Sequence, residues 1–163
     1  MFEGIFASIK YGEYLKHAKA THTRAVDIEK AECIKCGFCC LQRPCIPTPK
    51  EFEEIAKFLD ITPSEALKKF FVIDALETGG TKFVFPAKES QLDITGHYVP
   101  WRRTYDEGYC IFFDKTEKKC KIWIVRPNTA RVMECWSNSD EKVARDEALK
   151  AWENFNFSEL TRC

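Results

Sequence analysis

The sequence predicts a small α+β protein in which several helices surround a short β-hairpin or sheet, organised on a cysteine-ligated metal site. Three observations support this fold class. Two helix starts are strongly marked, at Thr48 and Thr62, and two β-rich segments lie within residues 109–125. Nine cysteines occur in 163 residues, four of them within residues 33–40. A chain of this length builds one hydrophobic core, so we expect residues 1–163 to form a single domain.

The cysteines divide this domain into three parts. Residues 1–32 carry a loose apolar repeat at helical spacing and predict an N-terminal helical segment. Residues 33–136 hold every cysteine except Cys163 and form the expected cysteine-cluster core. Residues 137–163 predict a C-terminal helix, at about 140–153, and a tail. The apolar residues expected on that helix are Val143, Ala144, Leu149 and Trp152.

Composition excludes several classes of protein. The formal net charge is +0, so bulk charge does not favour a nucleic-acid partner. No stretch approaches the roughly 18 apolar residues that a membrane-spanning helix requires. The first residues include an acid, Glu3, and no long apolar run, which is not typical of a secretory signal. We therefore expect a cytoplasmic protein, whose clustered cysteines bind metal more often than they form disulfides.

The first cysteines form the most specific pattern in the chain. Cys33, Cys36 and Cys39 follow the spacing C-x2-C-x2-C, and Cys40 comes directly after them. Bacterial ferredoxins use such a run to hold three corners of a [4Fe–4S] cluster, while a further ligand comes from elsewhere. Gly37 lies between two of these cysteines, where a tight loop often needs a positive φ. The pattern therefore predicts a metal site with an iron–sulfur cluster as the favoured occupant.

The next segment predicts two helices and a strand. Cys45 is interpreted as a small buried hydrophobic residue, with a further metal ligand as the alternative. Thr48 and Thr62 are each followed by proline and, three positions on, by glutamate, which is the pattern of a capping box. Residues 82–85 predict a short strand that ends at Pro86. The apolar residues expected on the two helices are Phe52, Ile55, Ala56 and Leu59, then Ala66, Leu67, Phe70 and Phe71.

Residues 97–105 form an aromatic and basic loop. The loop contains Tyr98, Trp101, Arg102 and Arg103, and these residue types are common anchors of protein interfaces. Two interpretations stay open: a surface loop with one buried tryptophan, or a docking surface for a larger protein or enzyme complex.

A β-hairpin and another helix follow this loop. The segments 109–113 and 120–125 are β-rich and are joined by a short charged linker. With a symmetric turn, Cys110 should face Cys120, and opposed residues have Cβ atoms about 5 Å apart. Arg126 and a proline then predict a helix, with the proline at its first position, that runs to Cys135 and beyond.

Two ligand sets are compatible with these positions. Zinc takes four tetrahedral ligands, which Cys33, Cys36, Cys110 and Cys120 could supply, but Cys39, Cys40 and Cys135 then have no role. A [4Fe–4S] cluster could use Cys33, Cys36 and Cys39 with Cys110 or Cys120, leaving Cys40 as an alternate or second-site ligand. We favour the cluster over zinc. The candidate residues that would surround such a cofactor are Lys35, Gly37, Arg126 and Arg131, with a solvated side chain as the alternative for Lys35.

The chain resembles the YkgJ-type cysteine-cluster family, CxxCxxCC, whose members are described as zinc- or iron-chelating domains. The resemblance rests on the run from Cys33 to Cys40, the Thr48 helix, the hairpin cysteines, and Arg126-Pro127 with Arg131, over roughly residues 33–136. One position departs from the family pattern, because Ala130 stands where the family usually has a cysteine. Lysine N-methylase members of the family pair a similar domain with an iron–sulfur cluster, but no additional catalytic domain is evident here.

These patterns favour an iron–sulfur accessory protein that transfers electrons to, or senses redox state or oxygen for, a larger enzyme. A zinc-stapled module for protein interaction is the first alternative. No Ser/His/Asp set, phosphate loop or His-Glu-x-x-His pattern is present, so an enzyme, the second alternative, would have to work at the metal.

Overall fold

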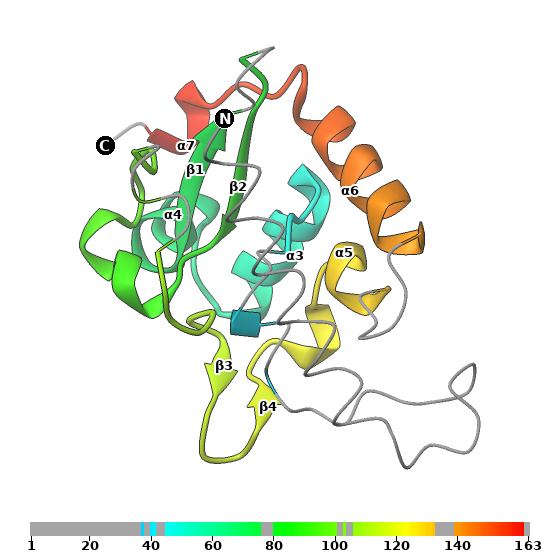
Figure 1. The fold of residues 1–163 in the computed structure, drawn as a ribbon. Helices are drawn as coiled ribbons and strands as arrows, with labels where there is room; N and C mark the ends of the chain where they lie inside the picture. The colour runs from blue at the N-terminus through cyan, green and yellow to red at the C-terminus, as the bar shows by residue number, and fades with distance from the viewer. Residues whose placement is uncertain are drawn as a thin grey trace, which may run out of the picture.

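The computed structural model describes residues 37, 40–41, 45–75, 80–100, 103, 106–132 and 139–161. Helices pack around a two-stranded antiparallel sheet, and a second, smaller hairpin projects from them (Figure 1). The predicted α+β class is therefore confirmed. The predicted N-terminal helical segment lies outside the described residues. None of the described helices combines the length and the apolar character needed to cross a bilayer.

Two capped helices lead into the larger sheet. Helix α3 spans Pro49–Phe58 and helix α4 spans Pro63–Phe70. The Thr48 hydroxyl accepts a hydrogen bond from the Glu51 N–H (3.2 Å), and the Glu51 carboxylate accepts one from the Thr48 N–H (2.8 Å). The same reciprocal pair forms at the start of α4. Both predicted capping boxes are confirmed.

The larger sheet pairs strand β1, Phe71–Ala75, with strand β2, Lys82–Pro86. The register joins Phe71 to Pro86 at one end and Ala75 to Lys82 at the other. The prediction of strand β2 is confirmed. Phe71 was predicted to lie in the second helix, which is wrong, because α4 ends at Phe70 and Phe71 begins β1. Phe71, Val72 and Ile73 are all buried in succession. A strand covered on both faces buries consecutive residues, whereas a helix turns every second or third residue away from the core.

The C-terminal half contains the small hairpin, several short helices and the longer helix α6. The predicted helix after Arg126 begins at Asn128, with Pro127 at the N-cap rather than at the first helical position, and it ends at Arg131. The expected continuation to Cys135 is wrong, and Asn128, Thr129 and Val132 are poor helix formers. The remaining elements are η2 (Glu89–Ile94), β3 (Phe113–Asp114), β4 (Lys119–Cys120), η4 (Trp123–Val125), α5 (Asn128–Arg131), α6 (Ser139–Trp152) and α7 (Ser158–Thr161).

Helix α6 confirms the predicted C-terminal helix and covers one side of the fold (Figure 1). Ala144, Ala148 and Trp152 follow one another at four-residue spacing and are buried. Val143 was expected on this apolar face but is 59% exposed, because it lies one position, and so about 100°, away from that stripe.

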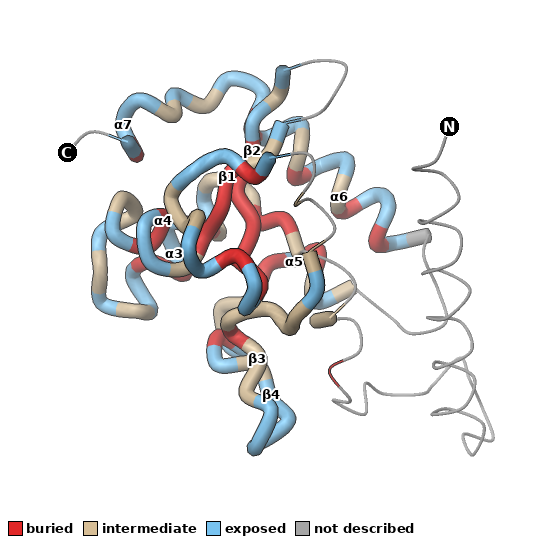
Figure 2. Tube along the Cα trace, turned by 60° about the vertical axis from the view of Figure 1, so that its left-hand side comes forward, coloured by how far each residue is buried: buried red, intermediate tan, exposed pale blue. Residues whose placement is uncertain are grey.

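The hydrophobic core lies where α3, β1 and β2 meet, and the tip of the small hairpin is exposed (Figure 2). The Phe52 ring packs edge-on against the Phe71 ring, with centroids 5.0 Å apart. Phe112 and Ile122 extend this core to the base of the small hairpin. The hairpin is therefore anchored at its base, next to the cysteines at positions 110 and 120.

Candidate metal centre

Gly37, which lies within the run from Cys33 to Cys40, packs against the small hairpin. This glycine is buried and has a φ of +77°, so the predicted positive φ is confirmed. A Cβ atom added at Gly37 would lie 2.3 Å from Cζ of Phe113, the first residue of β3. The Gly37 carbonyl accepts a hydrogen bond from the Leu41 N–H (3.1 Å), which closes a helical turn around Cys40. The close approach of the Phe113 ring and the positive φ both require glycine at position 37. This contact holds Gly37 against the small hairpin.

A backbone hydrogen bond joins Cys40 to the segment before the hairpin. The Cys110 N–H donates to the Cys40 carbonyl (3.0 Å), and the Cys110 carbonyl accepts from the Phe113 N–H (2.8 Å). Cys110 also forms an isolated antiparallel bridge with Lys88. Two cysteines that lie 70 positions apart in the sequence are thus neighbours in the fold.

The hairpin register differs from the predicted one. Cys120 pairs with Phe113, not with Cys110, and Asp114 pairs with Lys119. The reason is the turn: the Asp114 carboxylate accepts hydrogen bonds from the N–H groups of residues 116 and 117 (3.0 and 2.9 Å), which closes the chain over residues 115–118. The strand expected over residues 120–125 ends at Cys120, and Trp123–Val125 form the 3-10 helix η4 instead.

Electrostatic repulsion nevertheless links Cys45 to Cys40, Cys110 and Cys120, and Cys110 to Cys120. Burial, with repulsion from the Cys40 and Cys120 thiolates, raises the pKa of Cys45 to about 12. Burial, with repulsion from Cys45 and Cys120, also raises the pKa of Cys110, and burial raises that of Cys120. Thiols in this environment keep their protons at neutral pH unless a metal displaces them. Such soft donors suit zinc or iron.

Three cations oppose the effect of burial on these thiols. Burial raises the pKa of each thiol, and the positive charge of a cation partly offsets this rise: Arg126 for Cys120, Lys88 for Cys110, and Arg145 of α6 for Cys45. The Arg126 guanidinium also stacks on Trp123, 3.4 Å from the ring centroid. Of these cations, the sequence pointed only to Arg126. No local pattern identifies Lys88 or Arg145, since both approach the thiols through tertiary packing.

Arg131 has a different environment from Arg126. Its guanidinium donates to the carbonyls of Arg126 (2.9 Å) and Ile124 (3.2 Å). These hydrogen bonds hold the turn between η4 and α5, and so they position Arg126.

Within the part of the chain that the structure describes, no three Cys, His, Asp or Glu side chains stand close enough together to hold a metal ion. The predicted site residues outside the described ranges are Cys33, Lys35, Cys36, Cys39 and Cys135.

The loop at 97–105 is described only in part, because Trp101 and Arg102 lie outside the described residues. Tyr98 is 47% exposed, and Lys82 lies over its ring. Arg103 forms ion pairs with Asp93 (2.8 Å) and Asp106 (2.7 Å) and therefore ties the loop to η2.

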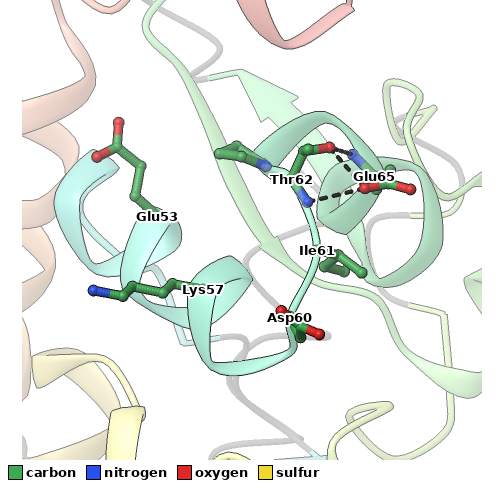
Figure 3. A pocket seen from close by; sticks show the side chains of 7 residues that line it. Glu53, Lys57, Asp60, Ile61, Thr62 and Glu65 are labelled. Carbon is green, nitrogen blue, oxygen red and sulfur yellow. Dashed lines mark hydrogen bonds between the residues drawn. The ribbon is translucent and has the colours of Figure 1, made fainter.

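An open groove of about 430 Å³ lies between α3 and α4 (Figure 3). Its polar lining includes Glu53, Lys57 and Asp60, while Thr62 and Glu65 are engaged in the capping box. It contains no thiol, and nothing else in it points to a ligand.

Comparison with known proteins found one family model and one relative that match this chain. The model of the CxxCxxCC family, described as "Putative zinc- or iron-chelating domain", matches residues 32–150. The chain is also 33% identical over 125 residues to Uncharacterized protein MJ0661 of Methanocaldococcus jannaschii. That match covers 77% of this chain and 56% of the relative, so the chain spans little more than half of the relative's length. No solved structure matches the chain.

Proposed function

The chain belongs to the CxxCxxCC family of zinc- or iron-chelating domains, and we propose that it binds a [4Fe–4S] cluster as an accessory protein. In this role it transfers electrons to, or senses redox state or oxygen for, a larger enzyme complex. The observation that carries the proposal is that two residues of the cysteine run contact the segment 110–113: Gly37 packs against Phe113, and the Cys40 carbonyl accepts a hydrogen bond from the Cys110 N–H.

The ligand pattern supports a cluster. Cys33, Cys36 and Cys39 have the spacing of a three-thiolate run, which needs one further cysteine from a remote segment. Cys110 and Cys120 belong to the segment on which the loop docks. When bound, the cluster would supply one-electron redox chemistry; the chain's own residues would hold it and exclude water.

The charges around the thiols support either metal. Thiolates bound to zinc or to a cluster carry more negative charge than the metal neutralises, and burial makes that charge costly. Arg126, Lys88 and Arg145 would stabilise it from three separate segments. In a cluster, such cations would also raise the reduction potential.

A structural zinc site is the second candidate. The predicted zinc set takes Cys33 and Cys36 from the cysteine run, Cys110 from the segment before the hairpin and Cys120 from strand β4. A single ion shared between such segments would staple the fold together. This candidate gives a colourless protein that is stable in air and unfolds when a chelator removes the ion.

We further propose that loop 97–105 docks on the larger partner. Tyr98 is exposed at its start, and Trp and Arg follow, which are residue types that anchor interfaces. Replacing Trp101 and Arg102 by alanine should release proteins that co-purify with the chain. Unchanged co-purification would remove the loop from consideration, and Leu92→Ala, another exposed apolar residue, is the control.

The test of the cluster is metal and sulfide analysis of protein purified without oxygen. About four irons and four sulfides per chain, with a broad absorption near about 400 nm that fades in air, are expected for a [4Fe–4S] cluster. About one zinc per chain in a colourless protein would refute the cluster and leave the structural zinc site.

A further inference from the structure

Residues 118–126 form a basic segment with an apolar centre, which we call the hairpin surface. The segment runs from the hairpin turn through β4 and η4, at the end of the fold from which the hairpin projects (Figure 1). It contains four cations and no acid, although the formal net charge of the whole chain is +0. The side chains that reach solvent here are Lys118, Lys119, Lys121, Trp123, Ile124 and Arg126.

The centre of this surface exposes two large apolar side chains in succession. Trp123 is 40% exposed and Ile124 is 75% exposed, whereas Ile122 directly before them is 2% exposed. A lone exposed apolar side chain is ordinary on a protein. Two consecutive ones leave apolar area in water, and covering that area with a partner is favourable.

The backbone that presents this centre is fixed before any partner binds. Helix η4 packs against α3, and the Arg131 guanidinium donates a hydrogen bond to the Ile124 carbonyl (3.2 Å). The Arg126 guanidinium stacks on the Trp123 ring, 3.4 Å from its centroid. A surface held in this way loses little conformational entropy on binding, so more of its contact energy becomes affinity.

The charges around the apolar centre indicate the chemistry of the partner. Lys118 and Lys121 are exposed, and among the residues that the structure describes no carboxylate forms an ion pair with either of them. Lys119 has a long contact with Glu117 (3.5 Å), in which both side chains are more than half exposed. The surface therefore carries a surplus of positive charge, which is complementary to an acidic surface.

We propose that the hairpin surface binds an acidic surface of another protein that has apolar residues at its centre. Trp123 and Ile124 form the dry core of this contact, and the lysines form its charged rim, which is the usual anatomy of a protein interface. A nucleic acid fits less well, because a branched aliphatic side chain offers no flat face on which a base can stack. Two copies of this chain related by a two-fold axis fit less well too, because lysines would face lysines.

This inference rests on the proposed accessory role in one respect, the existence of a protein partner. It depends neither on the identity of the metal nor on loop 97–105. It adds a second surface, and it names the charge of the surface that this one binds.

A photoreactive side chain at the apolar centre tests the contact in the full chain. Ile124 is replaced by p-benzoylphenylalanine, cells that produce the protein are irradiated, and the cross-linked peptides are sequenced by mass spectrometry. The captured peptide should come from another protein and be rich in Asp and Glu. The same replacement at Val143, which is 59% exposed on α6, is the matched control and should not capture this peptide.

Charge reversal then tests the lysines. Lys118→Glu combined with Lys121→Glu should lower the yield of this cross-link about tenfold or more, because repulsion replaces attraction. Lys118→Arg combined with Lys121→Arg keeps both charges and should preserve the yield. Lys150→Glu, at an exposed position on α6, is the matched control for charge and should leave the yield unchanged.

The outcomes separate this surface from the proposed function. Capture of an acidic peptide that charge reversal abolishes supports the proposal. The proposal is overturned by no capture, by a captured peptide without an excess of Asp and Glu, by capture of a second copy of this chain, or by a nucleic-acid or lipid adduct. A chain that holds the expected cluster but gives one of those results refutes only the hairpin surface. A chain that binds neither iron nor zinc but captures the acidic peptide refutes only the metal site.

Discussion

Gly37→Ala tests the contact that brings the cysteine loop to the hairpin. Alanine at a φ of +77° meets a penalty of about 1–2 kcal/mol from its Cβ atom. The same Cβ would lie 2.3–3.0 Å from three atoms of the Phe113 ring. That ring stacks on Tyr109, with centroids 5.0 Å apart, so it has little room to move aside. Such overpacking costs about 1–3 kcal/mol more.

Gly80→Ala is the matched control. Gly80 also has a positive φ, +68°, but nothing lies within 4 Å of its Cβ position. Gly80→Ala should therefore lower the free energy of unfolding by about 1–2 kcal/mol. Gly37→Ala should lower it by about 2–5 kcal/mol, the sum of both terms. Because the loop then no longer docks on the hairpin, Gly37→Ala should also reduce the metal content, whereas Gly80→Ala should not.

Urea unfolding of the metal-loaded proteins and metal analysis provide the measurements. Adding Phe113→Ala removes the clash, so the cost of Gly37→Ala should shrink by about 1–3 kcal/mol in a double-mutant cycle. The reasoning is wrong if Gly37→Ala costs no more than Gly80→Ala, or if the cost is the same with and without the Phe113 ring.

Three further predictions concern the surroundings of the site. Glu51→Ala should destabilise the protein by about 0.5–1.5 kcal/mol more than Glu65→Ala in urea unfolding, because Glu51 also accepts a hydrogen bond from the Asn128 N–H. Equal losses would show that this hydrogen bond contributes nothing. Trp152→Phe should cost about 1–3 kcal/mol, since a buried carbonyl beside the Cys45 segment loses its donor; a loss under about 0.5 kcal/mol would contradict this. The pKa of Cys45 is raised from 9.0 to about 12, so the folded metal-free protein holds this proton more tightly than the unfolded chain. That contribution is intact below pH 9.0 and is lost as the pH rises toward about 12, so the metal-free parent should lose stability relative to Cys45→Ala over this range. Parallel pH profiles would refute it.

Local signals in the sequence determined much of the fold. The capping boxes at Thr48 and Thr62, strand β2 and helix α6 follow from residues within a few positions of one another, and all are observed. The positive φ of Gly37 was also predicted from local sequence, because a tight turn often requires a positive φ that glycine adopts without steric cost. The small hairpin was likewise predicted from local sequence, but its predicted length and register were wrong.

Only the tertiary structure decided how these parts meet. The apolar run from Phe71 to Ile73 is compatible with a helix or a strand, and pairing with β2 selects the strand. The turn after Asp114 sets the hairpin register, which is why Cys120 faces Phe113.

The surroundings of the thiols were equally beyond sequence reasoning. The segment after Cys45 is joined to helix α6 by the hydrogen bond from the Trp152 indole to the Pro47 carbonyl, 105 positions apart, and Lys88 and Arg145 act on Cys110 and Cys45 from other segments. Spacing along the chain identifies donors that one short loop can turn toward a point. Donors and cations from distant segments converge only when the core forms, since burial of apolar surface, not local backbone preference, brings those segments together.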